Sequence, residues 1–172
     1  MIRVPVIETP RLILRGPRPA DLAALTRFFR SPRSHIIGGP KGRVRSALVL
    51  LGMAAHWLRR GYGYWQIVVR ATGARAGAVG LARFPGADEP ELGAFLYDGH
   101  EGQGIALEAA RAARAHAARA FGIDRVASFV NPANARAVAF MGRLGATFER
   151  EGRVAGHACH IYRHPQVGGS PA

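Results

Sequence analysis

Two glycines, Gly102 and Gly104, separate a strand-like segment, Glu91 to Tyr97, from an alanine-rich stretch that is predicted to be helical from about Ile105 to Phe121. Glycine lets backbone amides approach a ligand closely, because it has no side chain. The first turn of a helix adds unpaired N–H groups and the positive end of the helix dipole. A strand, a glycine turn and a helix in this order therefore predict an anion-binding site, and the anion we expect is a pyrophosphate.

Length and composition favour one globular domain. The chain has 172 residues, 48% of them hydrophobic, which suffices for one core but not for two full domains. We assign residues 1–166 to a single domain and expect residues 167–172 to form a flexible tail. No run approaches the roughly 20 apolar residues of a membrane span, and residues 1–10 lack the apolar region of a secretory signal. The protein is therefore predicted to be cytoplasmic, with no membrane partner.

The single cysteine, Cys159, leaves no partner for an internal disulfide and no cysteine cluster for a metal. We expect it to be an inert, buried thiol. It lies in the sequence His157-Ala158-Cys159-His160, where strand alternation would place His160 on the face opposite Cys159. No metal site is expected.

The formal net charge of +13 is compatible with nucleic-acid binding, but the distribution of the charge argues against it. Lys41 is the only lysine, and the arginines are scattered from Arg3 to Arg163 rather than gathered in one tract. The acidic residues are more informative, because five of the eleven lie within fourteen positions around the glycine turn, namely Asp88, Glu89, Glu91, Asp98 and Glu101. This acidic patch favours a cationic partner.

Periodicity predicts alternating strands and helices. Strands are expected at Arg11–Arg15, which Ile2–Ile7 could extend, and at Gly63–Arg70, Arg75–Phe84, Leu92–Tyr97, Arg125–Val130, Thr147–Arg150 and His157–Tyr162. Helices are expected at Asp21–Phe29, Arg43–Arg59, Ile105–Phe121 and Asn134–Leu144, and Ser31–Gly42 is predicted to be a loop. Trp65 is expected in the core, whereas Trp57, Tyr62 and Tyr64 could also line a groove. The order of the elements predicts an α+β fold with helices on the faces of a sheet.

Several short motifs, none specific alone, occur in an order that resembles the GCN5-related N-acetyltransferases, especially the branch that includes the ribosomal-protein N-terminal acetyltransferases. They are Glu8-Thr9-Pro10-Arg11-Leu12, Gly61-Tyr62-Gly63-Tyr64-Trp65, Gly77 to Leu81, Glu91-Leu92-Gly93, Gly102-Gln103-Gly104-Ile105-Ala106 with Glu108 and Ala109, Asn131-Pro132-Ala133-Asn134, and Leu144-Gly145. The resemblance implies a mixed, mostly antiparallel, twisted sheet of about seven strands with four helices on its faces, splayed between its fourth and fifth strands.

In that family the glycine turn binds the pyrophosphate of acetyl-CoA, the co-substrate. The resemblance therefore assigns cofactor binding to the backbone amides of Gly102, Gln103, Gly104, Ile105 and Ala106. The family prefers Gln or Arg where this chain has Glu101, so we expect the Glu101 side chain to point to solvent or toward the acceptor. Arg136, with Arg111 and Arg114, could contact the phosphates of CoA.

The strand before the turn is implied to carry the chemistry. Backbone N–H groups near Phe95 and Leu96 would polarise the thioester carbonyl in the slot between the splayed strands. An ammonium acceptor must lose a proton before its nitrogen can attack, and Glu91 at the start of the strand is the candidate base. An exposed residue that merely begins a strand is the alternative interpretation of Glu91.

Asn131 and Asn134 are also assigned to the cofactor site by the resemblance, although an ordinary turn and a helix N-cap explain them equally well. Many relatives place a serine or a tyrosine as proton donor where this chain has Ala137 and Met141. Tyr162, or Tyr97, could take that role, and each could equally be a packing residue.

These observations predict an N-acetyltransferase that transfers the acetyl group of acetyl-CoA directly to a primary amine in a ternary complex. The expected acceptor is a protein N-terminus or a cationic small molecule, and a homodimer is possible. A noncatalytic acyl-CoA-binding module is the first alternative, and a basic nucleic-acid-binding domain is the second.

Overall fold

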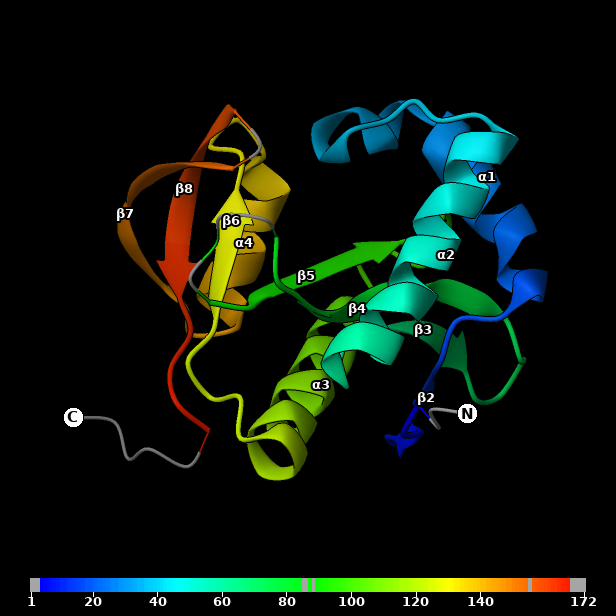
Figure 1. Cartoon of the computed structure of the whole chain (residues 1–172), viewed down its shortest axis with the longest axis horizontal. Coiled ribbons are helices and arrows are strands. Elements are labelled where there is room, and N and C mark those ends of the chain that lie inside the picture. The colour runs from blue at the N-terminus through cyan, green and yellow to red at the C-terminus, as the bar shows by residue number, and fades with distance from the viewer. Residues whose placement is uncertain (1–3, 85–86, 88, 155, 168–172) are drawn as a thin grey trace.

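The computed structural model describes residues 4–84, 87, 89–154 and 156–167, whose arrangement is shown in Figure 1. The elements are β1 (Ile7–Glu8), β2 (Leu12–Arg15), the 3-10 helix η1 (Pro19–Asp21), α1 (Leu22–Arg30), the 3-10 helix η2 (Pro32–Ile37), α2 (Arg43–Arg60), β3 (Tyr64–Val69), β4 (Arg75–Ala82), β5 (Glu91–Leu96), α3 (Ile105–Phe121), β6 (Ala127–Val130), α4 (Ala135–Arg143), β7 (Thr147–Val154) and β8 (His157–Arg163). Asp88 and residues 168–172 of the expected tail lie outside the described residues.

One sheet contains all of these strands, in the order β1-β2-β3-β4-β5-β6-β8-β7. Neighbouring strands are antiparallel except for β5 and β6, which run parallel. The predicted α+β fold is confirmed. The sheet has eight strands rather than about seven, because the two-residue strand β1 pairs with β2.

Helices cover both faces of the central strands. Helix α3 packs through its small side chains, since Ala109, Ala113 and Ala117 are fully buried in a core cluster that also contains Trp65 and Trp57. The predicted core position of Trp65 is thus confirmed. On the other face, α1 and α2 form a second cluster with the end of β5. In Figure 1, β6, β8, β7 and α4 form one side of the molecule, α1 and α2 form the other, and β5 runs between them.

The segment Ser31–Gly42, predicted as a loop, contains the 3-10 helix η2. Pro32 occupies its first turn, and the buried Ser34 hydroxyl donates to the carbonyls of Phe29 (2.9 Å) and Ser31 (2.9 Å). Gly38, in the left-handed conformation, ends it. These hydrogen bonds satisfy backbone carbonyls that would contact solvent in an irregular loop.

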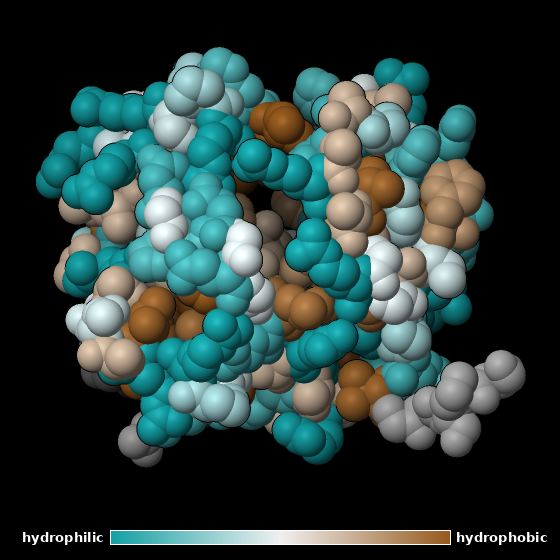
Figure 2. Space-filling view, turned by 180° about the vertical axis from the view of Figure 1, so that it is seen from behind, coloured by the Kyte–Doolittle hydropathy of each residue, from teal (hydrophilic) through white to brown (hydrophobic). Residues whose placement is uncertain are grey.

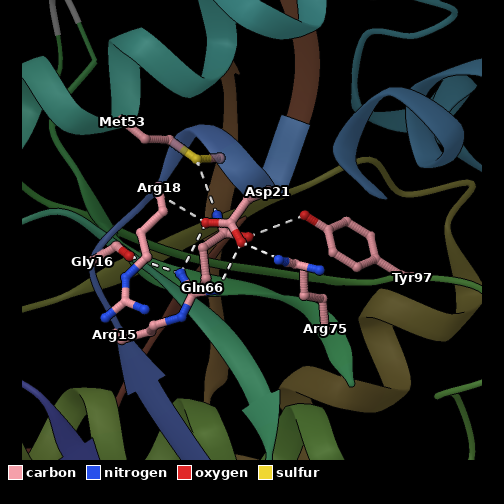
Figure 3. Close-up of polar contacts among 8 residues, drawn as sticks. All are labelled: Arg15, Gly16, Arg18, Asp21, Met53, Gln66, Arg75 and Tyr97. Atoms are coloured by element: carbon pink, nitrogen blue, oxygen red, sulfur yellow. Dashed lines mark hydrogen bonds and ion pairs between the residues drawn. The ribbon is translucent and has the colours of Figure 1, made fainter. Parts of the chain in front are cut away.

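A buried ion-pair network joins the N-terminal segment to the sheet (Figure 3). The Asp21 carboxylate, which is 0% exposed, accepts two hydrogen bonds from the Arg15 guanidinium at 2.7 and 2.9 Å. It also accepts bonds from the Arg75 side chain at 2.9 Å and from the Arg18 backbone N–H at 2.8 Å. The network therefore connects β2, η1 and β4.

No helix in the described part of the chain is sufficiently long and apolar to cross a bilayer.

Candidate active site

Strands β5 and β6 separate almost as soon as they meet. Their register contains one pair, Glu91 with Ala127. Beyond it, side chains bridge the two strands: the Glu91 carboxylate accepts the backbone N–H of Phe129 at 3.3 Å, and the Ser128 hydroxyl donates to the carbonyl of Leu92 at 2.6 Å. These side-chain bonds replace a continuous ladder, so the edge of β5 is left open toward its C-terminal end.

The opening widens into a cleft of about 810 Å³. Figure 2 shows a hollow in the middle of the molecule, with hydrophobic side chains in its walls and hydrophilic residues around its mouth. The walls come from η2, α2, β5, β6, α4 and β8. Among the described residues, Lys41 and Glu91 are the lysine and the carboxylate that line it, together with three histidines, His35, His56 and His157.

The predicted glycine turn lies between β5 and α3. Gly102 and Gly104 adopt φ angles of 72° and 75°, which a residue with a side chain adopts only with strain. Gly104 is the N-cap of α3, and its carbonyl accepts the first helical hydrogen bond from the N–H of Glu108 at 3.0 Å. The N–H groups of residues 105–107, in the first turn of α3, therefore have no intrahelical partner. This geometry suits the oxygens of a phosphate group.

Residues between β1 and β2 contact the glycine turn and the first turn of α3. Arg11 pairs with Glu108 at 2.6 Å and donates to the carbonyl of Gln103 at 2.8 Å. The Thr9 hydroxyl donates to the same Glu108 carboxylate at 2.6 Å. Within the Glu-Thr-Pro-Arg-Leu motif, Arg11 thus neutralises the Glu108 carboxylate in the first turn of α3 and Thr9 adds a hydrogen bond to it, so that this carboxylate does not compete with an anionic ligand.

Glu101 does not point freely to solvent. Arg33, from η2, forms ion pairs with both Glu101 and Asp98, the latter at 2.5 Å. Glu89 pairs with Arg163 and Arg125 on the other side of the molecule. Of the described members of the acidic patch, Glu91 alone lines the cleft, so the patch contributes one carboxylate to it rather than a field of negative charge.

Glu91 lies at the point where the two strands separate. Burial raises the pKa of its carboxyl to about 7, although the hydrogen bond from the Phe129 N–H opposes this shift. A group with this pKa exists in both protonation states near neutral pH, which is the property that a general base needs.

Asn131 and Asn134 both line the cleft, and each uses its side-chain oxygen locally. Asn131 accepts the N–H of Ala133 at 2.9 Å, and Asn134 caps α4 by accepting the N–H of Ala137 at 3.2 Å. No hydrogen bond within the described part of the chain uses their side-chain NH₂ groups, so these donors are available to a ligand. Arg136 is exposed in the first turn of α4.

Phe95 lines the cleft and stacks on Phe28, with 4.9 Å between the ring centroids. Leu96 follows it at the end of β5 and packs against the larger core cluster. Arg114, one of the arginines considered for phosphate contact, is buried and donates instead to the carbonyl of Pro165.

The tyrosines considered as proton donors do not line the cleft. Tyr162 is 9% exposed and packs in the larger core cluster, beside Phe148. The hydroxyl of Tyr97 donates to Gln66 at 3.1 Å beneath α1 and α2. Strand alternation explains the position of Tyr162, because Cys159, which lines the cleft, is three positions away on β8 and therefore faces the opposite side of the sheet. Burial raises the pKa of the Cys159 thiol, as expected for an inert cysteine.

Sequence reasoning missed Ser128 and His164. Ser128 donates to Leu92, so it accepts a hydrogen bond from Nε2 of His164 at 2.8 Å. Burial, then the nearby arginines Arg114 and Arg163, lower the pKa of His164 to about 4, so the ring is neutral. A serine within the apolar strand Ala127–Val130 was the available signal.

Comparisons with known proteins agree with this geometry. Residues 11–147 match the Acetyltransferase (GNAT) domain. An acetyltransferase from Agrobacterium tumefaciens is 34% identical, with a TM-score of 0.88 over 96% of this chain and 97% of that chain.

Two more distant structures share the fold. One is RimL, the ribosomal L7/L12 alpha-N-protein acetyltransferase, in complex with coenzyme A (19% identity, TM-score 0.77, 93% and 97% of the two chains). The other is the Salmonella typhimurium acetyl transferase that modifies the N-terminal serine of the 50S ribosomal subunit protein L7/L12 (17%, 0.78, 95% and 99%). The chain therefore belongs to the GNAT family and is an acyl-CoA-dependent acetyltransferase.

Proposed function

We propose that this acetyltransferase transfers the acetyl group of acetyl-CoA directly to a primary amine in a ternary complex, with Glu91 as general base. The observation that carries the proposal is the position of Glu91, a carboxylate with a pKa of about 7 at the point where β5 and β6 separate. Among the described residues, no other carboxylate lines the cleft.

The glycine turn and the open edge of β5 would bind different parts of acetyl-CoA. The diphosphate of CoA would be held by the backbone amides of the glycine turn and the start of α3, at Gly102, Gln103, Gly104, Ile105 and Ala106. Arg136 would lie near the other phosphate group of CoA. Backbone groups at Phe95 and Leu96 and the amides of Asn131 and Asn134 would hold the pantetheine arm. This arrangement brings the thioester toward Glu91, because the arm has to follow β5 from its C-terminal end to its N-terminal end.

Glu91 would accept the proton of the acceptor ammonium, directly or through one water. The neutral nitrogen then attacks the thioester carbonyl carbon, a C–N bond forms, and the C–S bond breaks to release the CoA thiolate. A thiol with an ordinary pKa of about 8.5 leaves as a thiolate and can take its proton from water. Tyr162 is not assigned as the acid, because it lies in the core.

For the acceptor, we propose a protein N-terminal amine or a cationic small molecule in the cytoplasm. Two structural neighbours act on the N-terminus of a ribosomal protein, which supports a peptide acceptor. An activity screen in which anionic or neutral amines clearly outperform cationic ones would overturn the cationic preference. The oligomeric state stays a prediction.

Saturation with acetyl-CoA is expected to raise the melting temperature. At 100 times Kd, a ligand that binds only the folded state contributes about 2.7 kcal/mol, which corresponds to about 5–10 °C for a domain of this size. Thiol release with a panel of amines and peptides then measures turnover. An unchanged melting temperature contradicts cofactor binding, whereas binding without turnover of any amine favours the noncatalytic module.

Replacing Gly104 by alanine is expected to raise the Kd for acetyl-CoA about 10–100-fold, because losing one hydrogen bond to a charged group costs about 1.5–3 kcal/mol. The side chain strains a residue with φ of 75° and shifts the amides at the start of α3. Isothermal titration calorimetry measures the Kd.

Gly122→Ala is the matched control for this substitution. Gly122 ends the same helix with φ of 65°, and an added Cβ there meets no atom within 4 Å. The two variants should lose similar stability, but Gly122→Ala should keep the wild-type Kd. Equal Kd values for the two variants would remove the glycine turn from the cofactor site.

A further inference from the structure

One row of residues across the sheet leaves space for a tyrosine side chain. Tyr64 of β3 is paired with Gly80 of β4, and Gly80 is paired with Gly93 of β5. A Cβ built on Gly93 would lie 1.9 Å from the Tyr64 hydroxyl oxygen, and one built on Gly80 would lie 2.4 Å from the Tyr64 Cα. At Gly80 a side chain would therefore meet the backbone of Tyr64, and at Gly93 it would meet the end of the Tyr64 ring, so the Tyr64 hydroxyl reaches β5.

The hydroxyl reaches the part of β5 where the acyl group is expected. Glu91 and Gly93 are two residues apart on a strand, so they face the same side of the sheet as Tyr64. Tyr64 lines the cleft with both of them, and among the described residues it is the one tyrosine that does so. No hydrogen bond between described residues uses its hydroxyl.

The surroundings keep this hydroxyl protonated. Burial, and then the charge of Glu91, raise the pKa of the Tyr64 phenol well above its ordinary value. A phenol of this kind neither ionises nor gives up its proton readily, but it donates a hydrogen bond to a negative oxygen. The lining of the cleft is apolar at Ala137 and Met141, and the hydroxyl of Ser128, which also lines the cleft, already donates to the carbonyl of Leu92.

We propose that Tyr64 is a catalytic residue whose hydroxyl donates a hydrogen bond to the thioester oxygen as that oxygen becomes negative. When the amine nitrogen attacks, the carbonyl π electrons move onto this oxygen, and they return to form the amide as the C–S bond breaks. Tyr64 keeps its proton throughout. The inference rests on the proposed acetyl transfer, and it places a side-chain donor nearer to Glu91 on β5 than the backbone groups at Phe95 and Leu96, which would hold the pantetheine arm.

Replacing Tyr64 by phenylalanine is expected to lower kcat about 10²–10³-fold, the usual cost of losing one donor to an oxyanion. The Kd for acetyl-CoA should change less than about twofold, since the bond strengthens only in the transition state. The acid limb of kcat/KM should keep its midpoint, because Glu91 remains. Tyr62→Phe is the control, since Tyr62 lies in the same segment but does not line the cleft, and it should retain wild-type kcat.

A second variant tests the geometry without altering Tyr64. Gly93→Ala places a methyl group where the hydroxyl lies and should lower kcat to a similar extent. The double variant Tyr64→Phe/Gly93→Ala should be no slower than either single variant, because both changes remove the same interaction. Fully additive losses of kcat in the double variant, or a Tyr64→Phe enzyme with kcat within about threefold of wild type, would overturn the role of Tyr64 but not the proposed acetyl transfer. A wild-type protein without turnover overturns the proposed function and this role with it.

Discussion

Replacing Glu91 by glutamine is expected to lower kcat about 10²–10⁴-fold, the range that a positioned general base contributes. Glutamine keeps the size of the side chain and can still accept the N–H of Phe129, which is 3.3 Å from the carboxylate. It cannot take a proton from the acceptor ammonium. Thiol release at saturating acetyl-CoA and amine measures this loss.

The pH dependence identifies the base. The pKa of about 7 predicts that kcat/KM of the wild type rises with pH through about 7, because only ionised Glu91 accepts a proton. The glutamine variant should lack this acid limb and show only the titration of the amine. An acid limb that persists in the variant assigns it to another group.

Whereas kcat/KM rises with pH, the free energy of unfolding of the wild type should fall as pH rises over the same range. The pKa of Glu91 is higher in the folded state than its ordinary value of 4.5, so the folded protein binds more protons between about pH 4.5 and 7. Ionisation of Glu91 therefore lowers the free energy of unfolding as pH rises through this window. Glu91→Gln removes this loss and should be at least as stable as wild type at pH 8, which separates a catalytic defect from misfolding.

Glu149→Gln is the matched control for Glu91→Gln. Glu149 lies in β7, pairs with Arg163 at 2.7 Å and does not line the cleft. Its replacement should leave kcat and the acid limb unchanged. A comparable loss in both variants would contradict a specific role for Glu91 and would favour the interpretation of Glu91 as a strand-starting residue.

Replacing Asp21 by asparagine is expected to lower the free energy of unfolding by about 3–5 kcal/mol, because it leaves buried Arg15 without a compensating charge. The carboxylate accepts bonds from Arg15, Arg18 and Arg75, and asparagine can satisfy only part of this set (Figure 3). Urea denaturation at neutral pH measures the change.

The pH dependence of this loss follows from the direction of the Asp21 shift. Burial opposes ionisation of Asp21, but the hydrogen bonds from Arg15 and the Arg18 N–H outweigh it and hold the pKa of the carboxyl below 3.8. The network therefore stabilises the protein fully above about pH 4, and this contribution falls as pH drops through the folded-state pKa. The difference between wild type and Asp21→Asn should shrink in acid.

Asp98→Asn is the control for Asp21→Asn. The Asp98 side chain is half exposed and pairs with Arg33, so its loss should cost less than about 1 kcal/mol. A cost for Asp21→Asn as small as that for Asp98→Asn would mean that the buried network does not stabilise the fold.

Most of the fold was predictable from local patterns. Helix α3 begins at Ile105 and ends at Phe121 as predicted, because Gly104 and Gly122 bracket an alanine-rich stretch. Strand β1 (Ile7–Glu8) was predicted only as a possible extension of the strand at Arg11–Arg15, but it is a separate strand that pairs antiparallel with β2, because two residues carry no periodicity of their own. The 3-10 helix η2 was missed for a similar reason, since its Pro and Ser residues also suit a loop.

In the candidate site, too, the local features were predictable from the sequence and the contacts between distant segments were not. The glycine turn and the asparagine cap of α4 are local features, and the sequence predicted both. The sequence analysis named Tyr162 or Tyr97, and it could not show that Tyr64 is the tyrosine that lines the cleft, because Tyr64 and Tyr162 both lie in strands. The row of Gly80 and Gly93 beside Tyr64 exists only through pairing between strands.

The sequence by itself determined the family, the order of the elements and the glycine turn, because these depend on residues close together in the chain. Only the tertiary structure decided which charges act in the cleft. Arginines from η2 and β8 neutralise Asp98, Glu101 and Glu89, while Glu91 stays unpaired by any cation of the described residues and has its pKa raised by burial. Charge and proton affinity depend on neighbours brought together by folding, and the sequence does not specify their distances.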